Sequence, residues 1–225
     1  MLISRLEERF GYDKPIFTDD IFECMKDYSR QRIYQLISEA IKDRSLIRFD
    51  TGVYYLPTET EFGCSILTVN DVVNRKYIND NGETFGIYGK YVLDLNFLLS
   101  YQVPNTIEII TNKESRDVRE IEIRGRKVIL RKSRLPITKE NESAYTLMEL
   151  FNGIDMRQYR ENSMVRESIS AYIRENNIDS KMICNMASFF PARTMKNLAT
   201  SGVLYEITQQ QRSVQRIDKI GERPV

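Results

Sequence analysis

The stretch PIFTDDIFECMKDYSRQRIYQLISEAIKDRSLIRFDTGVYYLP, residues 15–57, decides the fold of the N-terminal part of the chain. A first helix is predicted to open at Thr18, whose hydroxyl can accept a hydrogen bond from a backbone N–H of the first turn. Its apolar residues fall on one side: Ile21, Phe22 and Met25. A tight turn over residues 26–28 then separates it from a second helix.

The second helix has the stronger pattern. Ser29 is its predicted N-cap, and apolar residues then recur at the i, i+3, i+4, i+7 and i+8 spacing of one helical face. They are Ile33, Leu36, Ile37, Ala40 and Ile41. This stripe predicts a helix that packs against a core along most of its length.

A short β-hairpin is predicted to complete the stretch. Ile47–Phe49 and Val53–Leu56 are alternating runs, and the turn between them, Asp50-Thr51-Gly52, contains a glycine. Two helices joined by a tight turn and followed by a hairpin are typical of a winged helix-turn-helix. A leading helix over residues 2–10, ended by Gly11, is expected to pack beneath them.

The face of the second helix opposite the apolar stripe is polar. A glutamine amide can pair with both N6 and N7 of adenine, and a recognition helix reads bases with its N-terminal residues. We therefore expect this face and one arginine of the hairpin to contact double-stranded DNA. The predicted DNA-binding residues are Ser29, Arg30, Gln31, Arg32, Tyr34, Gln35, Ser38, Lys42 and Arg48.

Two observations limit this prediction. A polar outer face is also usual on the helices of structural or protein-binding modules, so that alternative stays open. From Lys26 to Arg48, six basic residues stand against three acidic ones, which is a modest excess. We therefore expect tight DNA binding to need a homodimer or two cooperating monomers on repeated half-sites.

The composition excludes several classes of protein. The 225 residues have a net charge of +1, which excludes a bulk polyelectrolyte binder. The chain contains no histidine, which excludes every histidine-dependent catalytic triad or zinc site. Three widely spaced cysteines, Cys24, Cys64 and Cys184, suggest no disulfide framework and are expected to be small buried residues. Without a long apolar run, the chain is expected to be cytoplasmic and to make no membrane contact.

The chain is predicted to be α+β and to divide into three segments. The winged helix-turn-helix would occupy residues 1–60, with the polar Thr58–Glu61 as a linker. Residues 61–153 would form a small mixed α/β domain with an antiparallel sheet. Residues 154–225 would form a helical C-terminal segment whose last sixteen residues or so trail as a flexible tail.

A basic segment within the predicted middle domain is the densest in the chain. It contains six cations and no acid: Arg124, Arg126, Lys127, Arg131, Lys132 and Arg134. Alternating basic residues on a strand are often only a solvated outer face. The other interpretation is a second basic surface for nucleic acid or an acidic protein.

No catalytic, metal or cofactor site is expected. Gly86-Ile87-Tyr88-Gly89-Lys90 lacks the spacing of a phosphate-binding loop and is interpreted as structural. Four carboxylates, Asp94, Glu108, Glu120 and Glu122, show no nuclease motif. We therefore predict that the protein is not an enzyme.

The chain resembles the AbiEi-type antitoxins of abortive-infection type IV toxin–antitoxin systems. The resemblance covers roughly residues 15–200 and is carried by short, mostly structural motifs. They are the predicted winged helix, Gly52-Val53-Tyr54-Tyr55-Leu56-Pro57, Gln102-Val103-Pro104-Asn105-Thr106-Ile107-Glu108-Ile109, and the strand pair from Ile121 to Leu130.

In that family the N-terminal winged helix binds inverted repeats in the operon's own promoter, and the following domain is needed to neutralise a toxin of the nucleotidyltransferase type. The resemblance thus implies an autorepressor and antitoxin, with Arg30, Gln31, Arg32, Tyr34, Gln35 and Arg48 as DNA contacts. Two alternatives remain: a winged-helix regulator that senses a small ligand and has no toxin partner, and a protein-binding adaptor.

Overall fold

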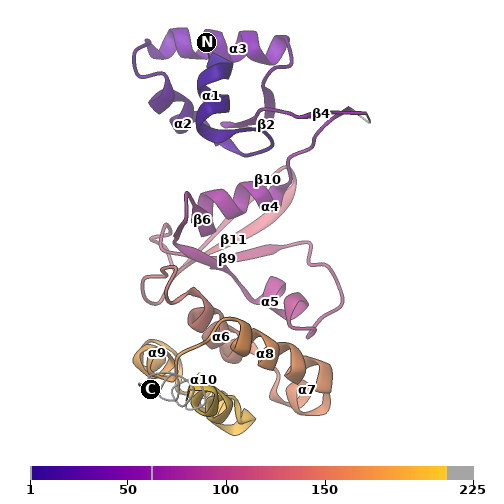
Figure 1. Ribbon diagram of the computed structural model, residues 1–225, viewed down its shortest axis with the longest axis vertical. Coiled ribbons are helices and arrows are strands. Elements are labelled where there is room, and N and C mark those ends of the chain that lie inside the picture. The colour runs from indigo at the N-terminus through magenta and orange to yellow at the C-terminus, as the bar shows by residue number, and fades with distance from the viewer. Residues whose placement is uncertain (1, 62, 212–225) are drawn as a thin grey trace, which may run out of the picture. The chain divides into compact units, whose positions relative to one another are not determined.

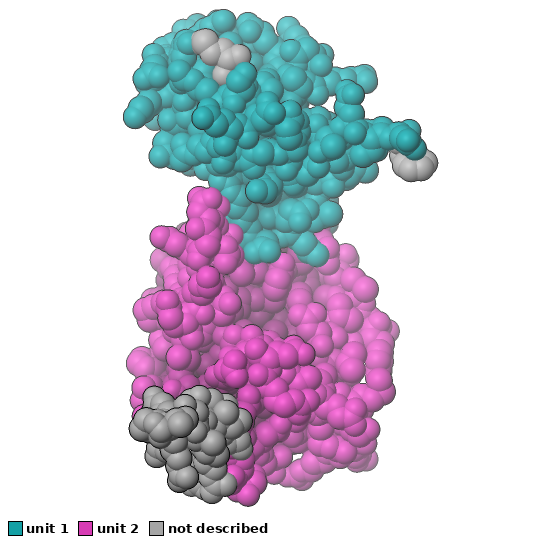
Figure 2. Space-filling view, viewed as in Figure 1, with its two compact units in different colours: residues 1–76, 123–125 teal, residues 77–122, 126–225 magenta. Residues whose placement is uncertain are grey.

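The computed structural model describes residues 2–61 and 63–211 and is a mixed α+β structure (Figure 1). The chain forms two compact units, which Figure 2 distinguishes by colour. Unit 1 consists of residues 1–76 and 123–125, and unit 2 consists of residues 77–122 and 126–225.

Unit 1 begins with three helices and a small sheet. The helices are α1 (Leu2–Phe10), α2 (Thr18–Cys24) and α3 (Arg30–Lys42). Strands β1 (Ile16–Phe17), β2 (Ile47–Asp50) and β3 (Val53–Tyr55) pair in the order β1-β3-β2, and both pairings are antiparallel. A two-stranded ribbon, β4 (Glu59–Thr60) and β5 (Gly63–Cys64), and helix α4 (Val69–Val73) follow.

The core of unit 1 fixes the orientation of α3. Ile33, Ile37 and Ala40 are buried, as the spacing predicts, while Leu36 and Ile41 are partly buried at the edge of the same stripe. They pack with apolar residues of the other elements: Leu2, Leu6, Ile16, Ile21, Met25, Leu46, Tyr54 and Leu56. The face of α3 opposite this stripe is therefore exposed.

The prediction that the Thr18 hydroxyl caps α2 is wrong. Helix α2 begins at Thr18 itself, and the Asp20 carboxylate accepts a hydrogen bond from the Phe17 N–H at 2.8 Å. The Thr18 hydroxyl instead donates to the carbonyl oxygen of Gly52 at 3.3 Å, and the Thr18 N–H donates to the same oxygen at 3.0 Å. Thr18 therefore anchors the β2–β3 turn to the start of α2.

Unit 2 contains a four-stranded sheet in the order β10-β11-β9-β8. Its strands are β8 (Gly86–Tyr88), β9 (Ile107–Thr111), β10 (Val118–Ile123) and β11 (Arg126–Lys132). A small ribbon, β6 (Asn79–Asp80) and β7 (Glu83–Thr84), precedes the sheet, and α5 (Lys90–Asn96) connects β8 toward β9. One π turn, Asn74–Ile78, follows α4.

This sheet is mixed, which corrects the prediction of an antiparallel one. β8 pairs antiparallel with β9, but β9 pairs parallel with β11 in the register Ile107–Val128 to Thr111–Lys132. The two-residue turn at Arg124-Gly125 matches the predicted hairpin between β10 and β11. The parallel pairing arises because β11, rather than β10, occupies the position beside β9.

Helices make up the rest of unit 2. They are α6 (Glu142–Gly153), α7 (Met156–Glu161), α8 (Ser163–Glu175), α9 (Ser180–Met186), the 3₁₀ turn Ala187–Phe189, and α10 (Ala192–Ser201). Residues 203–211 are also helical. Most of the predicted C-terminal tail lies outside the described residues.

The predicted boundaries near residues 60 and 153 differ from the observed division into units. Residues 61–76 belong to unit 1. The sheet and the C-terminal helices share one core, in which Ile87 and Ile110 pack with Tyr145, Phe151 and Ile169. Burial of this joint core explains why the sheet of unit 2 and its helices form one unit.

The three cysteines are more exposed than the sequence predicts. Cys64 and Cys184 are exposed and Cys24 is only partly buried, so the expectation that all three are buried is wrong. Cys64 lies on the narrow β4–β5 ribbon, which has no core side. Among the described residues, no helix has the length and apolar character needed to cross a membrane.

Asp13 connects the loop after α1 to the segment after β3. Its φ angle is 58°, in the left-handed region where Asp and Asn are enriched among non-glycine residues. Its carboxylate accepts hydrogen bonds from the Thr58 hydroxyl at 2.6 Å, from the Thr58 N–H at 3.1 Å and from the Ser65 hydroxyl. These bonds lower the pKa of Asp13 below its ordinary value, and the bond from Ser65 has the largest effect.

We expect Asp13→Asn to lower stability at pH 7 because a neutral amide accepts these bonds more weakly. A carboxyl whose pKa is lower when folded contributes stability above its unfolded pKa of about 4, and the contribution is lost as the pH falls through the folded pKa. The difference in unfolding free energy between wild type and variant should therefore shrink as the pH falls below the unfolded pKa and through the lower folded one. Urea denaturation of both proteins at neutral and acid pH tests this, and a difference that stays constant would contradict it.

Candidate nucleic-acid interface

Helix α3 is held at its N-terminus and along one face. The Ser29 hydroxyl accepts a hydrogen bond from the Arg32 N–H at 3.3 Å, so the predicted N-cap is confirmed. The apolar side, with Ile33 and Ile37 at its centre, is buried in the core of unit 1. Rotation of the helix about its axis is thereby fixed, and the polar side chains extend into solvent from a rigid element.

The exposed side of α3 contains a shallow depression that brings most of the predicted residues together. It is lined by Arg30, Gln31, Tyr34, Gln35, Ser38, Glu39 and Lys42. Tyr34 is 52% exposed, and its ring forms a T-shaped contact with the Phe22 ring at a centroid distance of 5.5 Å. The Arg30 guanidinium lies over the same Phe22 ring at 5.5 Å. Phe22 thus orients two polar side chains at the N-terminal end of this face.

Glu39 is the one carboxylate in this depression. It forms an ion pair with Arg32 at 3.4 Å, and Arg32 also donates to the side-chain oxygen of Gln35 at 3.3 Å. Both charged side chains are largely exposed, so the pair contributes little to stability. The pair nevertheless lowers the positive potential of the face. Glu39 is one of the three acidic residues in the local charge of this region, but the sequence pattern did not indicate that it shares this surface.

Arg48 lies on β2, and its side chain folds over the turn of the hairpin. Its Nε donates to the Asp50 carbonyl oxygen at 3.3 Å, and its terminal nitrogen donates to the Thr51 hydroxyl at 3.4 Å. The Arg48 side chain is exposed, so these contacts orient a cation at the hairpin. The predicted wing arginine is therefore present at the turn, outside the depression on α3.

Arg124 also lies in unit 1, although its sequence position places it in the predicted second basic surface. Its guanidinium stacks over the Phe49 ring at 5.0 Å, and its backbone N–H donates to the Asp50 carboxylate at 3.1 Å. The hairpin turn of unit 1 is thus associated with two arginines, Arg48 and Arg124. No local sequence pattern indicated this association, because residue 124 is far from residue 50 in the chain.

The rest of the predicted second basic surface is not a continuous cationic surface. Three cations form ion pairs: Lys127 with Glu120 at 2.8 Å, Arg131 with Glu108, and Arg134 with Glu149 at 3.1 Å. Arg126 donates to the Pro104 carbonyl oxygen at 2.9 Å. The absence of acids between residues 124 and 134 is compensated by carboxylates from other elements. This segment therefore contributes less positive surface than its sequence indicates.

Three of the four carboxylates Asp94, Glu108, Glu120 and Glu122 form ion pairs with cations of unit 2. Glu108 pairs with Arg131, Asp94 accepts from Lys90 at 2.7 Å, and Glu120 pairs with Lys127. Within residues 2–61 and 63–211, no group of three or more histidine, cysteine or acidic side chains is placed to hold a metal ion.

Comparisons with protein-family models, with curated proteins and with solved structures found no match. A functional assignment therefore depends on the residues and their geometry. The α3 face and the hairpin of unit 1 are the features that carry it.

Proposed function

We propose that this protein is a sequence-specific DNA-binding repressor and that unit 1 is a winged helix-turn-helix. In this proposal α3 is the recognition helix and the β2–β3 hairpin is the wing. The observation that carries the proposal is the exposed face of α3, on which Gln31, Gln35 and Ser38 accompany Arg30 and Lys42. Such a face offers hydrogen bonds to base edges together with cations for phosphates.

The arrangement of elements supports this proposal. α3 follows α2 after a short turn, the hairpin follows α3 directly, and β1 completes the sheet in the order β1-β3-β2. The major groove of DNA admits a helix, and residues near the N-terminus of that helix reach the bases. Gln31 and Gln35 lie on the first half of α3, where such contacts are made.

Base recognition and phosphate binding are assigned to different side chains in this proposal. Gln31 and Gln35 would read bases, with adenine as the preferred partner of a glutamine amide. Arg48, and Lys42 at the end of α3, would contact phosphates, which give affinity without sequence information. Arg32 becomes available when its exposed pair with Glu39 opens, at a small cost in free energy.

The modest positive charge of the α3 region indicates that two copies of unit 1 bind one operator. A protein that contacts few phosphates gains little from counterion release, so one unit alone binds weakly. A homodimer, or two cooperating monomers on inverted repeats, joins two such contacts on one DNA. In this proposal the operator lies in the protein's own promoter.

The antitoxin part of the proposal rests on the resemblance to AbiEi-type antitoxins. It assigns neutralisation of a nucleotidyltransferase-type toxin to the residues after the DNA-binding unit, and it requires no cofactor. A ligand-responsive regulator without a toxin is the second candidate, because unit 2 contains a cleft lined by charged side chains. The two candidates share every expectation for DNA and differ in the partner of unit 2.

Substitution of α3 and hairpin residues tests the DNA proposal. Gln35→Ala should relax sequence preference at a cost of about 1–3 kcal/mol, because a base contact is lost. Arg48→Ala should weaken binding to all sequences alike, because a phosphate contact is lost. The measurement is a gel-shift titration of the full chain against its upstream DNA, with scrambled competitor, at two salt concentrations.

Arg157→Ala serves as the control for this titration. Arg157 is 83% exposed on α7 in unit 2 and pairs only with Glu161 among the described contacts, so its loss should leave DNA binding unchanged. Unchanged binding by both Gln35→Ala and Arg48→Ala would contradict the docking. Little salt dependence and no preference for the upstream DNA would favour a protein-binding adaptor.

Glu39→Gln should strengthen DNA binding by the full chain. The substitution removes the carboxylate that faces the DNA in the proposed complex and releases Arg32 from its ion pair. We expect an increase of roughly threefold to tenfold in affinity at low salt, which diminishes as salt screens the charges. Fluorescence anisotropy with labelled upstream DNA measures it, and weaker or equal binding would show that this side of α3 does not face DNA.

The antitoxin proposal predicts rescue of growth. Expression of a neighbouring nucleotidyltransferase-type gene should arrest growth, and co-expression of this chain should restore it. A variant with both Gln31→Ala and Gln35→Ala should still restore growth, because the proposal places neutralisation after unit 1. Colony counts under induction measure this, and failure of the wild-type chain to rescue would favour the ligand-responsive regulator.

A further inference from the structure

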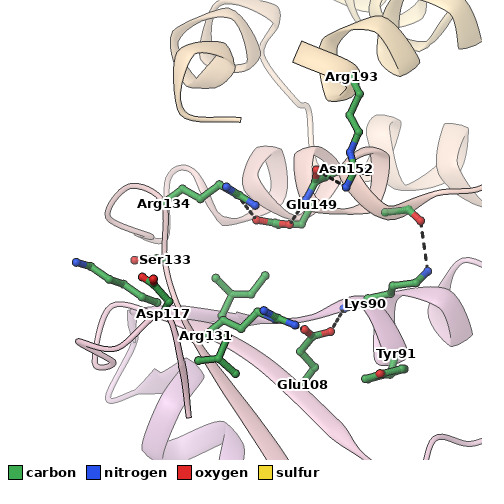
Figure 3. Close-up of a pocket in the computed structure, with 14 residues that line it drawn as sticks. Lys90, Tyr91, Glu108, Asp117, Arg131, Ser133, Arg134, Glu149, Asn152 and Arg193 are labelled. Atoms are coloured by element: carbon green, nitrogen blue, oxygen red, sulfur yellow. Dashed lines mark hydrogen bonds and ion pairs between the residues drawn. The ribbon is translucent and has the colours of Figure 1, made fainter. Parts of the chain in front are cut away.

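A polar cleft with a volume of about 540 Å³ lies entirely within unit 2 (Figure 3). One wall consists of β9, β11 and the start of α5, from which Glu108, Arg131 and Lys90 extend. The facing wall contributes Glu149 and Asn152 of α6 and Arg193 of α10. Its volume falls within the range of small-molecule sites, roughly 300–1,000 Å³.

Arg131 is oriented by a buried carboxylate on the first wall. The Glu108 side chain is only 8% exposed, and it accepts a hydrogen bond from the Lys90 N–H at 3.0 Å and pairs with the Arg131 Nε. Gly89 makes this position possible, because a Cβ there would lie 2.5 Å from the Glu108 Cγ. Both glycines of Gly86-Ile87-Tyr88-Gly89 therefore have a structural role: Gly89 admits Glu108, and at Gly86 a Cβ would meet the backbone carbonyl oxygens of Tyr77 and Ile110.

Arg134 is oriented by three groups near the second wall. Its Nε donates to Glu149 at 3.1 Å, and its guanidinium lies over the Phe190 ring at 5.2 Å. Its backbone N–H donates to the Tyr145 hydroxyl at 2.7 Å. Burial raises the pKa of Tyr145 to about 12, so the hydroxyl is neutral at physiological pH. A positioned guanidinium loses less conformational entropy when it binds a ligand than a mobile one does.

The cations reach solvent while their partner carboxylates do not. Arg131 and Arg134 are 46% and 39% exposed, whereas Glu108 and Glu149 are 8% and 11% exposed. Each arginine uses Nε for its ion pair, which leaves the terminal guanidinium nitrogens for another acceptor. A molecule in the cleft therefore meets the guanidinium groups of Arg131 and Arg134 before it meets their partner carboxylates, whereas Asp117 is an exposed carboxylate of the same lining.

The charge of the lining and one further arginine support an anionic ligand. Five cationic side chains line the cleft, Lys90, Arg131, Lys132, Arg134 and Arg193, against the three carboxylates of Glu108, Asp117 and Glu149. Arg193 makes one long hydrogen bond, 3.4 Å to the side-chain oxygen of Asn152. Arginines on both walls can thus converge on the same ligand.

We propose that this cleft binds a small phosphorylated molecule of nucleotide size. The planar guanidinium matches two phosphate oxygens at once, and such charge-assisted bonds are stronger than neutral ones. Tyr91, 45% exposed at the cleft, provides an aromatic face for a base. The proposal does not depend on DNA binding by unit 1, because its residues all lie in unit 2.

Isothermal titration of the full chain with ADP, inorganic pyrophosphate and adenosine, without DNA, tests the proposal. We expect ADP and pyrophosphate to bind at one site per chain and adenosine to bind far more weakly. Arg134→Gln and Arg193→Gln should each weaken ADP binding by about tenfold or more, because each removes charge-assisted bonds. Arg157→Gln, which changes an exposed arginine of α7 outside the cleft, should bind ADP like the wild type.

The outcomes separate this proposal from its rivals. Arg193 is exposed and its side chain has one long hydrogen bond, so Arg193→Gln should keep the thermal unfolding midpoint of the wild type. Loss of ADP binding by Arg193→Gln with an unchanged thermal unfolding midpoint supports ligand binding in the cleft. Absence of ADP and pyrophosphate binding, or equal binding by the cleft variants and wild type, overturns the proposal. Binding of a polyglutamate peptide in place of both phosphates also overturns it and indicates an acidic protein segment as the partner.

Discussion

The burial of one side of α3 is the constraint on which the proposed function depends. Ile33, Ile37 and Ala40 enter the core of unit 1, so the residues about half a turn away must face solvent. Because a packed core tolerates little rotation of the helix, the positions of Gln31 and Gln35 are set by residues that never meet a ligand. The same stripe thus determines both the stability of α3 and the chemistry it presents.

Charge in this protein has to be interpreted from the fold. The segment from Arg124 to Arg134 is purely basic in sequence, yet Glu120, Glu108 and Glu149 neutralise much of it. On α3 the effect is smaller but similar, since Glu39 pairs with Arg32. In the cleft of unit 2 the exposure of each partner decides the result, because the Glu108 and Glu149 carboxylates are largely buried and the Arg131 and Arg134 guanidiniums are not.

Local features were predictable from the sequence, whereas long-range pairings were not. The cap at Ser29, the apolar stripe of α3 and the β2–β3 hairpin depend on residues close together in the chain, and each is observed. Thr18 was assigned to the wrong partner because its acceptor, the Gly52 carbonyl, lies on another element. Periodicity also cannot specify that β11 lies beside β9, or that sheet and helices share a core. The α3 residues of the candidate site were therefore predictable, but Arg124 near the hairpin and the unit 2 cleft were not.

The membership of residues 123–125 in unit 1 has a consequence for synthesis of the chain. The first unit to leave the ribosome lacks the Arg124 contacts to Phe49 and Asp50 until residue 125 has also emerged. Its β2–β3 hairpin therefore acquires its last partner through a contact between distant parts of the chain, and such contacts form slowly. While residues 1–76 are outside the ribosome and Arg124 is still inside it, this unit should thus hold a folded helical core whose hairpin is less protected from hydrogen exchange than in the finished protein.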